Sequence, residues 1–120
     1  MRPRALIVDE NEVDRYTMAK LLEPLDIAVI ESGGADAALA AIAEVGPSVI
    51  LLDAGVEGSG LAPLAKLKGD GKTRSIPVIL LVSDPQTETR EQALRLGADD
   101  FVEKPVTREN LIPRIRRFVV

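Results

Sequence analysis

The chain contains no cysteine, no histidine and no tryptophan. Without cysteine there is neither a disulfide nor thiolate chemistry, which fits a reducing compartment. Without histidine, a Ser-His-Asp triad and the commonest metal ligand are excluded. The aromatic side chains are only Tyr16, Phe101 and Phe118, which argues against a surface that stacks on nucleic-acid bases.

Excess positive charge and long apolar runs are also missing. The formal net charge is −4 and the pI is about 4.9, so nothing indicates a nucleic-acid partner. The longest apolar run is far shorter than the ~20 residues that a membrane helix needs. Only four apolar residues separate Arg4 from Asp9, too few for a signal peptide. Residues 1–120 are therefore expected to form a single cytoplasmic domain with no membrane partner.

Short apolar runs alternate along the chain with amphipathic stretches of helical periodicity. Strands are expected over 4–8, 27–30, 49–52, 78–82 and 100–102, and helices over 13–22, 35–45, 61–68, 86–96 and 108–118. Such an alternation of strands and helices is typical of a doubly wound parallel sheet with helices on both faces. The near-continuous apolar strands agree with a sheet that is buried on both sides.

Local residues set the expected ends of the helices. Pro24 is expected to stop the first helix, Gly97 to cap the fourth, and Thr107 to cap the start of the last. In the first helix, helical spacing makes four apolar residues the expected core-facing side: Val13, Met18, Leu21 and Leu22. Pro113 falls inside the last helix, so this helix either kinks or begins late. Arg114, Arg116 and Arg117 in the same helix are expected to form a solvated face that suits the C-terminal dipole.

Acidic residues follow two of the expected strands directly. Asp53 ends the run 48–52, and Asp9 and Glu10 end the first strand. The C-terminal ends of parallel strands form the edge where ligands bind in such sheets. Two unit charges about 4 Å apart repel each other by roughly 4 kcal/mol at an effective dielectric near 20. A site that tolerates three carboxylates usually holds a hard cation such as Mg²⁺.

Lys104 follows the last strand and is expected to reach the same edge. A single aspartate after a strand is most often a turn former or a helix cap. Three acids and a lysine at matched strand ends instead favour phosphoryl transfer by positioning and electrostatics. In this interpretation Asp53 is the nucleophile, Glu10 and Asp53 hold Mg²⁺, Asp9 binds it through water, and Lys104 neutralises the phosphoryl oxygens.

In combination and order, five segments resemble the receiver (CheY-like) domain of two-component response regulators over nearly the full length. These segments are 6–10, 50–53, 77–81, 97–101 and 104–105. The resemblance implies a flavodoxin-like (βα)5 fold with strand order 2-1-3-4-5. It also implies that a histidine kinase or phosphotransfer protein donates a phosphoryl group to an aspartate of this chain.

Matched residue by residue, the resemblance assigns roles at the strand ends. The phosphoacceptor is Asp53, the acid pair is Asp9 and Glu10, and the lysine is Lys104. The third protein contact of Mg²⁺ is then the backbone carbonyl of Gly55. Output passes through protein contacts of the helix 4–strand 5–helix 5 face, to a downstream protein or domain or to a second copy of the chain.

The chain departs from the family at the hydroxyl that couples phosphorylation to conformational change. The Thr or Ser expected 22 residues before the lysine is Val82. Ser83 is adjacent, but neighbouring side chains of a strand point to opposite faces, so it substitutes only after a register slip or a bulge. The family's hydroxyl draws in an aromatic side chain, here Phe101. A hydrogen bond to a charged group contributes roughly 1.5–3 kcal/mol. Without it, the equilibrium constant that favours the switched conformation after phosphorylation would fall by about tenfold to a hundredfold.

The loop after Asp53 also departs from the family. Glu57 stands where proline is common, and Gly60 comes one residue earlier than the usual glycine. The glycine-rich segment lacks the Lys-Ser/Thr ending of a phosphate-binding loop. Asp84 is a further candidate, at the mouth of the site, for an effect on hydrolysis of the phosphoaspartate.

Two other functions remain open at this point. The first is a pseudo-receiver, which has the same fold but binds partners independently of phosphate, as Val82 favours. The second is a hydrolase, which would need a second acid two residues after Asp53, where Gly55 stands. Turnover of substrate is therefore not expected. The chain is expected to be either a stand-alone receiver or a part of a longer protein.

Overall fold

The computed structural model describes residues 2–56, 61–83 and 87–119. Five parallel strands form one sheet with the order β2-β1-β3-β4-β5, as the sequence predicted. The strands are β1 (Arg4–Val8), β2 (Ala28–Ser32), β3 (Val49–Asp53), β4 (Val78–Val82) and β5 (Asp100–Glu103). The helices are α1 (Glu12–Leu22), α2 (Ala35–Val45), α3 (Leu61–Gly69), α4 (Thr87–Leu96) and α5 (Arg108–Phe118), with a short 3-10 helix, η1, at Glu23–Leu25.

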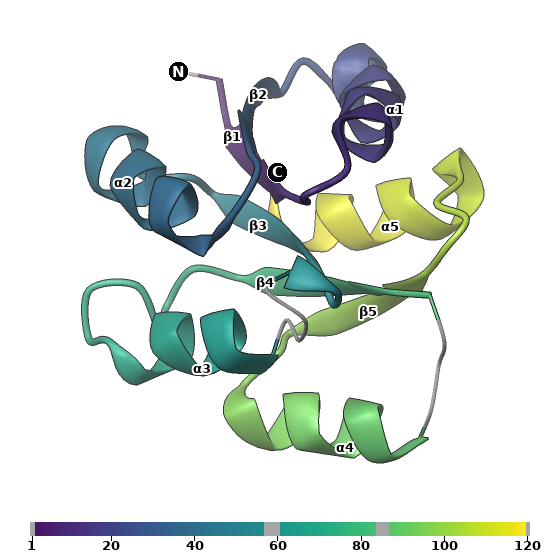
Figure 1. The fold of residues 1–120 in the computed structure, drawn as a ribbon. Helices are drawn as coiled ribbons and strands as arrows, with labels where there is room; N and C mark the ends of the chain where they lie inside the picture. Colours follow the sequence, from purple (N-terminus) through teal and green to yellow (C-terminus); the bar gives the residue numbers. More distant parts are fainter. Residues whose placement is uncertain (1, 57–60, 84–86, 120) are drawn as a thin grey trace.

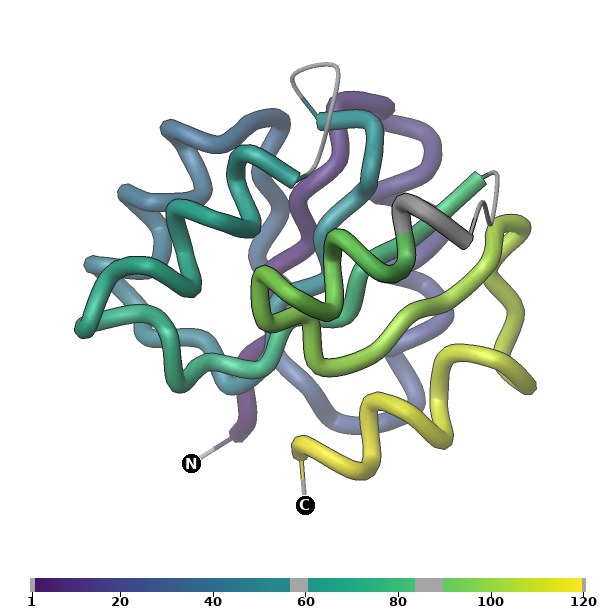
Figure 2. Tube along the Cα trace, turned by 90° about the horizontal axis from the view of Figure 1, so that it is seen from below, coloured from purple at the N-terminus to yellow at the C-terminus, as the bar shows by residue number. Residues whose placement is uncertain are grey.

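Helices cover both faces of the sheet (Figure 1). On one face α1 and α5 pack through Met18, Leu22, Leu111 and Ile115, all buried. On the other face lie α2, α3 and α4. Figure 2 views the molecule from the α4 side, with α3 on one side of α4, and β5 and α5 on the other. None of the helices in the described ranges is long and apolar enough to cross a membrane.

Alternation along the strands divides the core into two layers. In β1, Ala5 and Ile7 face α1 and α5, whereas Leu6 and Val8 face the other layer. These four side chains are between 0% and 1% exposed, so β1 is buried on both faces. Val8 is level with Leu52 of β3, and Asp53 is level with Leu81 of β4. The register therefore brings the C-terminal ends of β1, β3 and β5 to one edge.

One residue of α1 that was expected to face the core, Val13, faces the solvent instead. Val13 is 71% exposed, whereas Met18 and Leu22 are buried. Val13 precedes Met18 by five residues, which turns it about 140° away around an α-helix. The helix also begins at Glu12, because the Asn11 side chain accepts a hydrogen bond from the backbone N–H of Asp14.

The remaining helix ends follow from caps. Pro24 lies within η1 rather than at the end of α1. Gly97 has a φ of +102°, and its N–H donates to the carbonyl of Leu94. It ends α4 as expected, because glycine adopts positive φ without a Cβ clash.

Pro113 lies inside α5, and the helix nevertheless begins at Arg108. A late start is therefore wrong. The Thr107 side chain accepts a hydrogen bond from the Asn110 N–H, and the Asn110 side chain accepts one from the Thr107 N–H. This reciprocal capping fixes the start of the helix ahead of the proline. The Arg114 guanidinium also donates to the Asn110 carbonyl, at 2.6 Å.

Candidate functional site

Asp9 and Asp53 lie at the C-terminal edge of adjacent strands. Asp9 follows β1 directly, and Asp53 is the last residue of β3. Asp9 is 2% exposed, and one of its carboxylate oxygens accepts a hydrogen bond from the N–H of Asn11 at 2.9 Å. Oδ2 of Asp53 accepts one from the N–H of Gly55 at 3.0 Å. Both carboxylates are thus held by the backbone of the loops that follow them.

Lys104 joins these acids from the end of β5. Its Nζ lies 2.6 Å from Oδ1 of Asp53 and 3.1 Å from Oδ2 of Asp9. A third carboxylate, that of Asp14 in the first turn of α1, lies 3.2 Å away. The backbone N–H of Lys104 donates to the carbonyl of Val82 at 2.8 Å, which fixes the loop after β5 against β4. The peptide bond between Lys104 and Pro105 is cis.

Two opposing effects act on the pKa of Lys104. Burial of the ammonium group alone lowers its pKa. The hydrogen bonds and charges of Asp53, and then of Asp9, raise it by more, so the pKa of Lys104 lies above its ordinary value. The lysine is therefore firmly cationic at neutral pH, ready to neutralise an anion.

Raising the pH is expected to remove the stability contributed by Lys104 only above pH 10.5, the unfolded value. Because the folded-state pKa is higher, this contribution is complete below that pH and declines as the pH rises through the folded pKa. Urea unfolding of the wild type and Lys104→Met from pH 7 to 11 measures it as a difference in free energy of unfolding. Lys66→Met removes an exposed lysine of α3 and is the matched control substitution. A decline already below about pH 9 would mean that burial dominates the pKa.

An open depression of about 420 Å³ contains these groups. Its lining consists of Asp9, Glu10, Asn11, Asp14, Asp53, Ala54, Gly55, Val82, Ser83 and Lys104. All four residues expected to hold Mg²⁺ are among them. Their carboxylate and carbonyl oxygens are the hard donors that this ion prefers, so the donor set fits. In residues 2–56, 61–83 and 87–119, no three acidic side chains are already placed so that they could bind one metal ion together. The ammonium of Lys104 instead contacts two of the expected ligands, Asp9 and Asp53.

The three expected switch positions lie in or next to β4 and β5. Val82 is 2% exposed, and its pairing with Glu103 continues an unbroken β4–β5 register. The described strand therefore has no bulge that would move Ser83 into the place of Val82. Ser83 is exposed and lines the same depression. Its role as a substitute hydroxyl stays a prediction.

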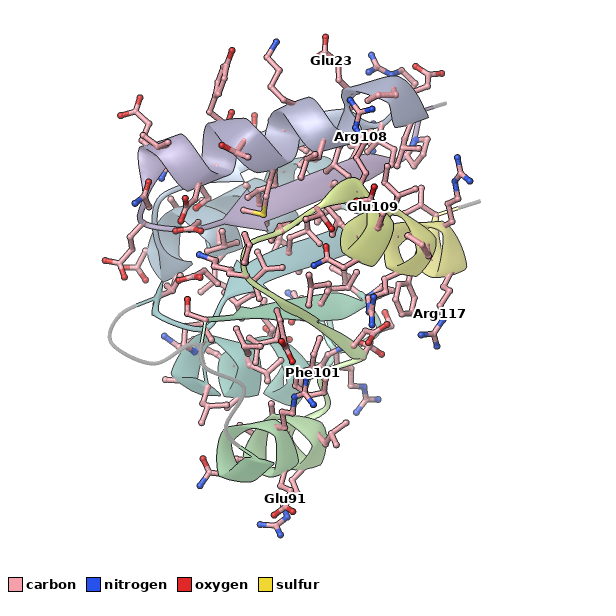
Figure 3. All side chains as sticks on the ribbon, turned by 90° about the vertical axis from the view of Figure 1, so that its right-hand side faces the viewer. Glu23, Glu91, Phe101, Arg108, Glu109 and Arg117 are labelled. Carbon is pink, nitrogen blue, oxygen red and sulfur yellow. The ribbon has the colours of Figure 1, made fainter. Side chains whose placement is uncertain are left out.

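Phe101 is partly buried between the sheet and α4 (Figure 3). The guanidinium carbon of Arg90 lies 5.9 Å from the centre of its ring. Arg90 also forms an ion pair with Glu103, at 3.1 Å. An arginine of α4 thus contacts both the aromatic side chain and an acid of β5.

Asp14 and Arg15 are residues of the site that the sequence did not single out. The guanidinium of Arg15 donates to the Asp9 carbonyl, and its Nε lies 3.4 Å from Oε1 of Glu31. This contact ties the loop after β1 to β2. Neither residue belongs to a motif, so the only available signal was their position in the first turn after the acid pair.

Two of the three arginines expected on a solvated face of α5 also form ion pairs. Arg114 and Arg117 both lie against Asp100 of β5, at 3.5 and 2.9 Å. Their side chains are nevertheless 39% and 64% exposed, so the ion pairs lie on the solvated face that the sequence predicted. Glu57, Gly60 and Asp84 lie outside the described residues.

Comparison with known proteins identifies the family. Residues 5–116 match the family model described as response regulator receiver domain. Protein PilH of Pseudomonas aeruginosa is 34% identical over 93% of this chain and 93% of its own length. The phosphate regulon transcriptional regulatory protein PhoB of Escherichia coli is 33% identical over 97% of this chain. This chain spans about half of that relative, 51%.

Solved structures agree. CheY4 of Vibrio cholerae, a chemotaxis protein, superposes with a TM-score of 0.91 over 99% of this chain and 100% of its own. Its sequence identity of 19% shows the fold alone. NtrX of Brucella abortus has a TM-score of 0.88 at 32% identity, covering 98% of this chain and 27% of that one. The chain belongs to the receiver domains of two-component response regulators, which are signalling modules rather than turnover enzymes.

Proposed function

We propose that this receiver domain accepts a phosphoryl group on Asp53. The observation that carries the proposal is the 2.6 Å contact between Asp53 Oδ1 and Lys104 Nζ at the sheet edge. In the reaction, a carboxylate oxygen of Asp53 forms a bond to phosphorus. The bond from phosphorus to the donor breaks, and the leaving group keeps the electron pair.

The residues of the edge have separate tasks in this reaction. The Gly55 N–H and the Lys104 ammonium orient the two oxygens of Asp53. Lys104 then neutralises the charge that the phosphoryl oxygens bring. Asp9, Glu10, Asp53 and the Gly55 carbonyl would hold Mg²⁺. When bound, this ion supplies further charge neutralisation and aligns donor and acceptor.

The donor in this proposal is a histidine kinase or a histidine-containing phosphotransfer protein. A cytoplasmic location goes with it, because such donors are charged from cytoplasmic ATP. Output is proposed to pass through the face formed by α4, β5 and α5, to a downstream protein or domain or to a second copy of the chain. That face carries the Arg90–Glu103 and Arg117–Asp100 ion pairs. Figure 3 shows Phe101 and Arg117 on this side of the molecule.

A second function, phosphate-independent binding of a partner, is favoured by Val82. Its side chain offers no hydroxyl to a phosphoryl group, and β4 keeps an unbroken register there. In such a pseudo-receiver, Asp53→Asn would leave partner binding unchanged.

Intact mass spectrometry separates the two functions. The protein is incubated with Mg²⁺ and acetyl phosphate, and one phosphoryl adduct is expected on the wild type and none on Asp53→Asn. Asp36→Asn removes an exposed carboxylate from α2 and is expected to keep the adduct. A wild type that gains no adduct, and binds no beryllofluoride under conditions where Mg²⁺ binds, would favour the phosphate-independent function.

A further inference from the structure

Lys104 has one more carboxylate partner than the proposed chemistry uses. Asp14 stands in the first turn of α1, where its N–H donates to the side chain of Asn11 at 3.0 Å. Its Oδ2 lies 3.2 Å from Lys104 Nζ, a contact between residues 90 positions apart in the chain. The Asn11 cap thus presents the Asp14 carboxylate to the end of β5.

The ammonium of Lys104 is fully engaged in this arrangement. An ammonium group has three N–H donors, and three carboxylates lie within hydrogen-bond distance of it, those of Asp9, Asp14 and Asp53. When Asp53 carries a phosphoryl group, its oxygens need the same donors. Asp9 and the phosphorylated Asp53 can hold the lysine between them, so the bond to Asp14 competes with the bonds to the phosphoryl group.

The negative charge of Asp14 also opposes phosphoryl transfer. Its side chain is 46% exposed and lines the depression that the donor must enter. Asp9, by contrast, is almost fully buried, with 3% of its side chain exposed. A carboxylate at the mouth repels an incoming phosphate, and water and salt screen this repulsion only in part.

We propose that Asp14 is an electrostatic brake on phosphoryl transfer. It is a positioning residue that holds the Lys104 ammonium toward α1 and adds negative charge at the entrance. This inference rests on the proposed role of Asp53. A purely structural role for Asp14, as a favourable acid in the first turn of α1, predicts loss of stability on substitution but no faster reaction.

The test compares rates of adduct formation at saturating Mg²⁺ with acetyl phosphate, followed by intact mass. Asp14→Asn keeps the shape of the side chain but removes its charge. It is expected to react about threefold to tenfold faster, since a half-exposed charge interacts more strongly than a surface pair and less than a buried one. Asp14→Glu restores the charge and should bring the rate back toward that of the wild type.

Glu12→Gln is the matched control. It removes one negative charge from the same exposed turn of α1, and Glu12 does not line the depression. The Glu12 variant should react at the wild-type rate. The advantage of Asp14→Asn should also shrink as the NaCl concentration rises, because salt screens the repulsion.

Each outcome decides between the claims. If the wild type forms no adduct and binds no beryllofluoride, the proposed function fails and the brake fails with it. If the wild type reacts but Asp14→Asn is no faster, only the brake is overturned. Equal acceleration by Glu12→Gln would also overturn it, because the effect would then be one of net charge and not of the contact with Lys104.

Discussion

Lys104→Met is expected to slow phosphoryl transfer from acetyl phosphate by about a hundredfold. Removing one group that stabilises charge in a transition state lowers rates by about 10²–10³. The lower end applies because bound Mg²⁺ shares the neutralisation. Lys104 is placed to stabilise this charge, because its Nζ lies 2.6 Å from Oδ1 of Asp53, the residue that would carry the phosphoryl group. Rates of adduct formation at saturating Mg²⁺ measure the effect.

Two variants control this measurement. Lys66→Met removes an exposed lysine of α3 and should leave the rate unchanged. Lys104→Arg keeps the charge but replaces a compact ammonium by a planar fork, so we expect an intermediate rate. A loss of less than about threefold in Lys104→Met would contradict the assigned role, because a group that neutralises the reacting oxygens contributes more than that.

Val82→Thr is expected to bind a phosphoryl mimic at Asp53 about tenfold to a hundredfold more tightly than the wild type does. The added hydroxyl can donate to a phosphoryl oxygen, and hydrogen bonds to charged groups contribute about 1.5–3 kcal/mol. Without phosphate the same change is expected to destabilise the domain, because Val82 is 2% exposed and a buried hydroxyl without a partner costs about 1–3 kcal/mol. The opposite signs in the two states make this prediction specific.

Beryllofluoride, which mimics a phosphoryl group on aspartate, allows both states to be measured on one sample. The dissociation constant of beryllofluoride in the presence of Mg²⁺ reports how much residue 82 contributes to binding this phosphoryl mimic. The backbone amide signal of Phe101 reports whether the aromatic side chain moves. Val82→Ala is the control, because it also changes the packing of β4 but adds no donor. If the threonine and alanine variants bind beryllofluoride equally, residue 82 does not contact the phosphoryl group.

Periodicity and strand-end chemistry were sufficient to predict a doubly wound parallel sheet and the gathering of Asp9, Asp53 and Lys104 at one edge of it. Parallel strands with buried faces leave few choices of register, so the carboxylates at the C-terminal ends of β1 and β3 meet at one edge. The confirmed strand order followed from the family resemblance, and five alternating units favoured a doubly wound sheet. The roles of these residues remain proposals.

Contacts between elements were not predictable in the same way. Whether Asp14 reaches Lys104 depends on how α1 packs beside the end of β5, and the sequence of neither segment records this. The exposure of Val13, by contrast, follows from helical geometry, because this residue lies about 140° from the buried Met18 around α1. The contact of Arg90 with Phe101 joins α4 to β5, and pairing of this kind is set by tertiary packing.

The most direct test of the central claim is to locate the phosphoryl group chemically. Borohydride reduces an acyl phosphate to an alcohol, so a phosphorylated aspartate becomes homoserine, which peptide mass spectrometry can place in the chain. After treatment with Mg²⁺ and acetyl phosphate, the account predicts homoserine at position 53 and at no other aspartate. Homoserine at Asp9, at Asp14 or at none of the aspartates would contradict it.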